Sequence, residues 1–177
     1  MIDIDLLKYP IGKFQKPNNI LFDDLKEAIE GIKTLPKFLE STVKDFSEEQ
    51  LDTQYRPGGW TVRQVVHHFA DSHINAFIRF KLALTEENPT IKPYDEAAWA
   101  NLSDSDLPIE ISVGILKNIH FKWGTILDQM SKSDFSRTYF HPESQKSVPL
   151  DEVTLMYNWH GKHHLAHIQA LIIRENW

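Results

Sequence analysis

Residues 150–174 read LDEVTLMYNWHGKHHLAHIQALIIR, with apolar residues at the three- and four-residue spacing of an amphipathic helix. At about 100° per residue, a cluster of histidines falls on the same side as this apolar stripe, within a sector of about 100°. The cluster comprises His160, His163, His164 and His167. A helix that turns several imidazoles toward the core predicts a buried polar site.

Three other segments carry the same periodicity, and stretches rich in Pro, Gly, Asn and Asp separate them. We predict helices over residues 18–46, 61–86, 109–130 and 150–174. The second should start with a capping box, because Thr61 and Gln64 have the spacing in which each side chain caps the other's backbone N–H. In the first, Pro36 predicts a kink or a restart. The third is expected to turn Ile115, Ile119, Trp123 and Ile126 or Leu127 toward the core.

Four amphipathic helices of this length predict an all-α fold, namely a four-helix bundle. A small β-hairpin is expected within residues 136–149, where two β-prone pieces flank a turn before the last helix. Residues 88–108 lack periodicity and are expected to form an ordered, functional loop. The length of 177 residues predicts a single domain over residues 1–177.

Composition excludes several classes of function. The net charge is -6 and no basic block is present, so nucleic acid is not an expected partner. No apolar run is long enough to span a bilayer, and no basic and apolar leader opens the sequence, so a cytoplasmic protein is expected. The chain has no cysteine. Any metal must therefore be held by nitrogen and oxygen ligands.

The histidines of the last helix favour a metal site. Buried imidazoles need partners, and a divalent ion satisfies several at once. Histidines four residues apart on a helix point toward one spot, which is typical of zinc helices. Two such pairs exist, His160 with His164 and His163 with His167, and periodicity does not choose between them. The alternative is that these histidines bond only to backbone or carboxylate partners.

A third ligand is expected from the second helix, which carries three histidines. His67 and His68 lie at about 130° on opposite sides of the apolar stripe, so periodicity leaves the choice between them open. His68 shares its face with Ser72 and Arg79, which predicts either a solvated surface or the wall of a polar pocket. His73 lies on the apolar side and is expected to be a core histidine with its hydrogen bonds satisfied.

Two motifs carry a resemblance to a known family: GGWTVRQVVHHFADSH at residues 58–73 and WHGKHHLAH at residues 159–167. With them the chain resembles the DinB superfamily of metal-binding four-helix bundles. It is most similar to the YfiT subgroup, described as metal-dependent hydrolases and related to bacillithiol transferases. The similarity extends over nearly the whole chain, including YPIGKFQ at residues 9–15, LDTQYRPGGW at residues 51–60 and YFHPES at residues 139–144.

The resemblance implies a specific ligand set. In that family one ligand lies eight residues after a tryptophan, which here leads from Trp60 to His68. The other two ligands are the outer histidines of an HxxHH pattern, which here are His160 and His164. The resemblance thus implies one divalent metal per chain, with zinc expected first and nickel as the alternative. It also implies a homodimer.

The chemistry of such a site has three interpretations. Three neutral imidazoles would let a bound metal lower the pKa of water toward about 7, which predicts hydrolysis of a small-molecule substrate. Gly161 follows His160, so the glutamate of HExxH peptidases is absent. The alternative is an S-transferase that activates a low-molecular-weight thiol, such as bacillithiol, for attack on an electrophile. The third is a noncatalytic metal-stabilised bundle, whose fourth ligand would be His163, His167 or His73.

Overall fold

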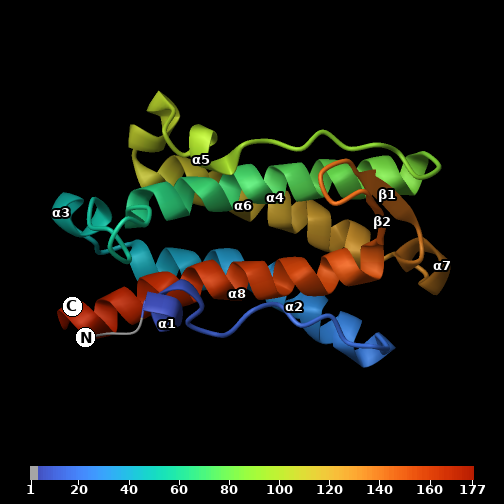
Figure 1. The fold of residues 1–177 in the computed structure, drawn as a ribbon, viewed down its shortest axis with the longest axis horizontal. Helices are drawn as coiled ribbons and strands as arrows, with labels where there is room; N and C mark the ends of the chain where they lie inside the picture. Colours follow the sequence, from blue (N-terminus) through green and yellow to red (C-terminus); the bar gives the residue numbers. More distant parts are fainter. Residues whose placement is uncertain (1–3) are drawn as a thin grey trace.

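The computed structural model describes residues 4–177, and within this range four long helices form a bundle (Figure 1). They are α2 (Phe22–Val43), α4 (Val62–Thr85), α6 (Ile109–Leu127) and α8 (Leu150–Glu175). The same range contains the short helices α1 (Ile4–Lys8), α3 (Glu48–Leu51), α5 (Glu96–Trp99), the 3-10 helix η1 (Ser103–Asp106) and α7 (Lys132–Phe135). The predicted all-α bundle is confirmed. No helix in residues 4–177 is long and apolar enough to cross a membrane.

The predicted hairpin is also confirmed. Strands β1 (Thr138–His141) and β2 (Lys146–Pro149) pair antiparallel immediately before α8. Residues 88–108 contain α5 and η1, and they are joined to β1 by two backbone hydrogen bonds. In these bonds Ile91 donates to the carbonyl of Phe140 at 3.1 Å, and Phe140 donates to the carbonyl of Pro89 at 2.9 Å. The long connection is therefore an ordered segment attached to the hairpin.

Local sequence signals explain where the helices begin. The capping box predicted at the start of α4 is present, because the Thr61 hydroxyl accepts from the Gln64 amide at 3.1 Å and the Gln64 side chain accepts from the Thr61 amide at 3.0 Å. Helix α2 starts at Phe22, later than predicted, where Asp24 accepts the backbone N–H of Leu21 at 2.8 Å. Pro36 does not interrupt α2, which continues through it.

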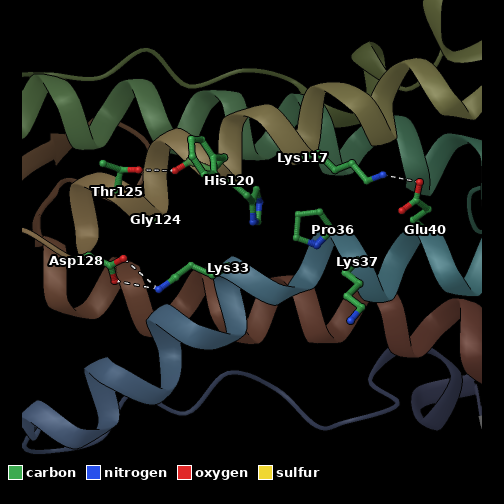
Figure 2. Close-up of a pocket in the computed structure, with 10 residues that line it drawn as sticks. Lys33, Pro36, Lys37, Glu40, Lys117, His120, Gly124, Thr125 and Asp128 are labelled. Atoms are coloured by element: carbon green, nitrogen blue, oxygen red, sulfur yellow. Dashed lines mark hydrogen bonds and ion pairs between the residues drawn. The ribbon is translucent and has the colours of Figure 1, made fainter.

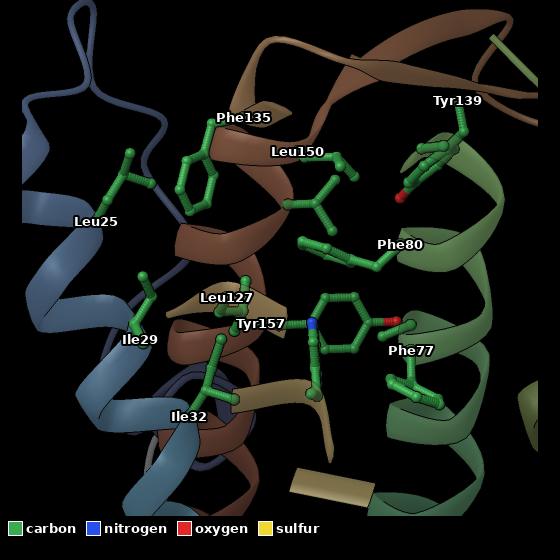
Figure 3. Packing of buried hydrophobic residues seen from close by; sticks show 14 of the residues in the cluster. Leu25, Ile29, Ile32, Phe77, Phe80, Leu127, Phe135, Tyr139, Leu150 and Tyr157 are labelled. Atoms are coloured by element: carbon green, nitrogen blue, oxygen red, sulfur yellow. The ribbon is translucent and has the colours of Figure 1, made fainter. Parts of the chain in front are cut away.

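Each long helix packs against two others. Helix α2 contacts α6 and α8, and α4 also contacts α6 and α8, so α2 and α4 are diagonal partners in the bundle. The apolar core has two clusters. The first is shown in Figure 3 and includes Leu25, Ile29, Ile32, Phe77, Phe80, Trp123, Leu127, Leu150 and Tyr157. The second includes Leu35, Leu39, Val65, Phe69, Leu116, Leu165, Ile168 and Leu171.

Histidines occupy the level between the two clusters. On α4, His73 lies between Phe69 of the second cluster and Ala76 of the first. On α6 and α8 the same level is occupied by His120, His160 and His164. The bundle thus holds a polar layer between two apolar ones, in which His73 and His120 are buried and His160 and His164 are half-buried, and this layer positions the candidate site.

The face predicted for the third helix was wrong in part. Ile115 is 38% exposed, and Ile119 is only partly buried. Helix α6 instead buries Ile109, Ser112, Val113, Leu116, His120, Trp123, Gly124 and Leu127. Two of these residues are polar, and they are buried because Ser112 and His120 make hydrogen bonds to residues of neighbouring segments. Apolar periodicity alone therefore misplaced the buried face.

Candidate metal centre

Three histidines from two helices converge at the centre of the bundle. His68 comes from α4, and His160 and His164 come from adjacent turns of α8. Each offers one ring nitrogen, and these nitrogens all lie within 4.8 Å of one another. The ring centroids are 4.5 Å apart for His160 and His164, 4.7 Å for His68 and His164, and 5.5 Å for His68 and His160. Among the described residues the cluster comprises these three side chains.

Burial keeps these imidazoles neutral. It lowers the pKa of His68 to about 4. Burial, and then the neighbouring imidazoles, hold the pKa of His160 and of His164 well below the usual 6.5. In addition, Nδ1 of His160 and Nδ1 of His164 are buried without a hydrogen-bond partner in the described part of the chain. At neutral pH the cluster therefore offers unprotonated nitrogen donors, which is the protonation state that a metal requires.

Aromatic side chains enclose the cluster on one side. Trp60, from the loop before α4, packs on His68 with ring centroids 4.7 Å apart and stacks parallel to His164 at 6.4 Å. Phe69 meets His164 edge-on at 5.8 Å. These apolar contacts restrict the orientation of the imidazoles and shield them from water.

The cluster opens into a pocket of about 340 Å³, whose lining also includes Trp60. The three histidines line it together with polar side chains from α4, the long connection and the hairpin. These polar side chains include Ser72, Arg79, Tyr94, Glu96, His141 and Glu143. The polar face that His68 shares with Ser72 and Arg79 is therefore the wall of a pocket, one of the two interpretations that the sequence allowed.

The remaining predicted candidates lie outside the cluster of three. Both ring nitrogens of His67 are bonded, Nδ1 to the Ser112 hydroxyl at 2.7 Å and Nε2 to the Leu107 carbonyl at 3.0 Å. His163 and His167 pair with each other through their Nε2 atoms, 3.1 Å apart. His67 is thus held by its own hydrogen bonds, and His163 and His167 bond to each other outside the cluster of three, although His163 also lines the pocket.

The interior histidine His73 is only half satisfied. Its Nδ1 lies 2.7 Å from Nε2 of His120, while its own Nε2 is buried and has no partner in residues 4–177. Sequence reasoning expected His73 in the core but did not single out His120. His120 could have been expected in the core from its position, because helical spacing places it on the same face of α6 as Leu116, Trp123 and Leu127.

Comparison with known proteins places the chain in a family. Residues 32–168 match the model of the DinB superfamily. A relative from Oceanobacillus iheyensis, named "Putative metal-dependent hydrolase", is 54% identical over 170 residues, which cover 96% of this chain and 98% of the relative. A relative of the same name from Geobacillus thermodenitrificans is 46% identical and is covered over its full length.

Solved structures agree with this assignment. YfiT from Bacillus subtilis, described as "a probable metal-dependent hydrolase with an unusual four-helix bundle topology", superposes with a TM-score of 0.94 at 42% identity, covering 97% of this chain and 99% of that one. A mycothiol-dependent maleylpyruvate isomerase shares the fold alone, with a TM-score of 0.63 at 17% identity over 81% of this chain and 60% of that one. From the family match and these relatives, the chain belongs to the DinB superfamily.

Proposed function

We propose that this protein is a metal-dependent hydrolase that binds one divalent ion through His68, His160 and His164. The observation that carries the proposal is the convergence of three neutral imidazoles at the inner end of a pocket. The names of the curated relatives support the same reaction class. Because imidazole ligands suit several first-row ions, we propose zinc first and nickel as the alternative.

The residues present fit such an ion. Three protein ligands leave one coordination position for water or substrate, which is the arrangement of catalytic zinc sites. When bound, the ion supplies Lewis acidity, which promotes loss of a proton from a water molecule or a thiol near neutral pH. Around it, Trp60 and Phe69 exclude bulk water from one side of the cluster. Arg79 and Tyr94 are placed in the pocket to bind polar groups of a small-molecule substrate.

Two carboxylates in the pocket lining are the candidates for proton transfer. Glu96 comes from α5 and Glu143 from the turn of the hairpin. Both line the pocket that the three histidines share, and we propose one of them as the proton acceptor in hydrolysis. Substitution of each by glutamine tests this role, because Gln preserves size and hydrogen bonding but cannot take up the proton.

Thiol transfer is the second candidate. One observation favours it: the cluster contains histidines only, with no carboxylate beside them among the described residues. A metal-activated thiol attacks an electrophile as its thiolate and needs no protein base in that step. Because the chain contains no cysteine, the thiol would be a small molecule that enters the pocket.

Metal content per chain, measured by elemental mass spectrometry, is the first test. We expect about one ion in the parent after metal loading, and loss of that ion in His68→Ala and His164→Ala. His67→Asn is the matched control, because it changes the neighbouring residue and keeps a polar group beside Ser112. Retention of metal in folded His68→Ala and His164→Ala would reject the proposed ligands.

The reaction type is then measured with the metal-loaded parent protein. Esters and amides are tested alone, and an electrophile is tested with and without a low-molecular-weight thiol. Turnover of an ester or amide without thiol supports hydrolysis, while conjugation that requires both thiol and metal supports transfer. A metal-loaded protein that is inactive in both assays, and whose tightly bound metal accepts no added ligand, would instead be a bundle stabilised by a structural metal.

A further inference from the structure

Helix α2 contains a carbonyl group that lacks its helical hydrogen-bond donor. Pro36 lies inside this helix and has no N–H, so the carbonyl of Ile32, four residues earlier, lacks its helical donor. Nδ1 of His120 on α6 lies 2.5 Å from that carbonyl oxygen and replaces the missing donor. Figure 2 shows Pro36 and His120 on the facing helices, beside a groove of about 430 Å³. Since a carbonyl oxygen only accepts, Nδ1 of His120 must carry the hydrogen.

This hydrogen fixes the protonation of the next ring. Burial lowers the pKa of His120 to about 4, so the ring is neutral and has one N–H. Its Nε2 is therefore a bare acceptor, and Nδ1 of His73, 2.7 Å away, must donate to it. His73 is 0% exposed, and its one hydrogen bond among the described residues is to another imidazole, so an uncompensated charge is disfavoured and this ring too carries a single hydrogen, on Nδ1. Its Nε2 is consequently a second bare acceptor.

That acceptor lies beside a candidate metal ligand. Nε2 of His73 and Nδ1 of His160 are both buried and both lack a partner among residues 4–177. The two ring centroids are 5.6 Å apart, less than 1 Å more than the 4.8 Å of the hydrogen-bonded pair His73 and His120. The two rings thus lie against each other, and each has one buried nitrogen without a partner.

We propose that His73 accepts the Nδ1 hydrogen of His160, which leaves Nε2 of His160 bare and directed at the metal. His73 and His120 are then positioning residues, and the Ile32 carbonyl anchors the series. The proposal rests on the metal site proposed above. Histidines that bind metals usually donate their other N–H to such an acceptor, and losing the acceptor weakens metal binding about 10–100-fold.

Two substitutions of His73 separate the two ends of its ring. In His73→Gln the amide oxygen reaches the former Nε2 position, so the acceptor for His160 is retained and the donor to His120 is lost. In His73→Asn the amide nitrogen sits near the former Nδ1 position, so the reverse holds. We expect zinc affinity, measured by competition with a chelator, to fall about 10–100-fold in His73→Asn and to stay within about threefold in His73→Gln.

The tautomer of His160 supplies a readout that needs no metal. Ring ¹⁵N chemical shifts of zinc-free parent protein should show His160 as the Nδ1–H tautomer, and His73→Asn should shift it toward a mixture. An Nε2–H tautomer in the parent overturns the proposal even if neither variant folds. So does an equal change of affinity in the two folded variants, whether large or absent. A parent protein that binds no zinc refutes the proposed metal site. The tautomer of His160 in that protein still tests whether His73 accepts its Nδ1 hydrogen.

Discussion

Acid should unfold the metal-free protein, because its interior histidines cannot take up protons without leaving the core. His68, His73 and His120 are 5%, 0% and 1% exposed. The pKa of His68 and of His120 is about 4, and that of His73 is well below 6.5, with burial as the first cause in each case. In the unfolded chain all three have a pKa near 6.5. Their contribution to stability is therefore complete above pH 6.5 and is lost as the pH falls below it.

The size of the loss follows from proton linkage. At pH 5 each of these three rings is neutral in the folded state and charged in the unfolded state, a difference of about 2 kcal/mol per ring. Together they lower the free energy of unfolding by about 6 kcal/mol between pH 7 and pH 5. Since domains of this kind have a total stability of about 5–15 kcal/mol, the zinc-free protein should be close to unfolding at pH 5.

One carboxyl group acts in the opposite direction. Burial, followed by the nearby charge of Asp104, raises the pKa of Asp71 to about 6, so the folded state binds this proton more readily than the unfolded state. Asp71 therefore adds stability as the pH falls through 6, and it offsets part of the loss from the histidines. Asp71→Asn removes the offset and should show the steeper decline.

Urea unfolding of the zinc-free protein, followed by circular dichroism at pH 7, 6 and 5 and constant ionic strength, measures this effect. We expect the parent to lose several kcal/mol over the range: His68, His73 and His120 contribute about 6 kcal/mol, His160 and His164 add to this loss, and Asp71 restores part of it. Asp71→Asn should lose more than the parent. A free energy of unfolding in Asp71→Asn that changes by less than about 1 kcal/mol from pH 7 to pH 5 would refute the assignment of these histidines as neutral, buried groups.

Three further predictions concern packing, the loop before α4 and metal binding. Gly161→Ala should destabilise the protein by about 1–3 kcal/mol, because a Cβ there would lie 2.5 Å from the buried side chain of Leu35. Gly114→Ala is the control: its Cβ would meet nothing within 4 Å, so it should stabilise α6 by up to about 1 kcal/mol. Thermal unfolding measures both variants, and a gain of stability in Gly161→Ala would refute the close packing against Leu35. Arg63→Met should cost about 1–3 kcal/mol in urea unfolding, because the buried guanidinium bonds Asp52 at 2.7 Å, and an unchanged midpoint speaks against that role. Zinc added at about 100 times its dissociation constant should stabilise the protein by about 2.7 kcal/mol and raise its melting temperature by several degrees. A chelator should reverse this shift. No shift in the melting temperature would mean that zinc does not bind the folded state.

The arrangement of the helices was largely predictable, because their boundaries depend on local signals. Polar and Pro-rich breaks, and the reciprocal cap of Thr61 and Gln64, placed the long helices within a few residues of their observed ends. The buried face of α6 was less predictable. Its contacts involve Ser112 and His120, which are polar and are buried only because α4 and α2 supply their hydrogen-bond partners. Hydrophobic periodicity within a single helix contains no information about those partners.

The candidate site shows the same division. Helical spacing alone brought His160 and His164 to one spot and gave an equal argument for His163 with His167. Which pair meets His68 depends on the rotation of α8 against α4, a tertiary property that spacing does not determine. The neighbour His67 was separable from His68 only by resemblance to a family, since its bonds to Ser112 and Leu107 come from distant parts of the chain.

The two backbone hydrogen bonds between Ile91, Phe140 and Pro89 have a consequence for redesign of the pocket. They join the long connection, which supplies Tyr94 and Glu96, to the hairpin, which supplies His141 and Glu143. The two segments of the pocket rim are thus held together by backbone hydrogen bonds. Substitutions that move one segment will therefore also move the other. Substrate scope should change most cleanly when both segments are transplanted together from one relative, while the helices below keep the histidines in register.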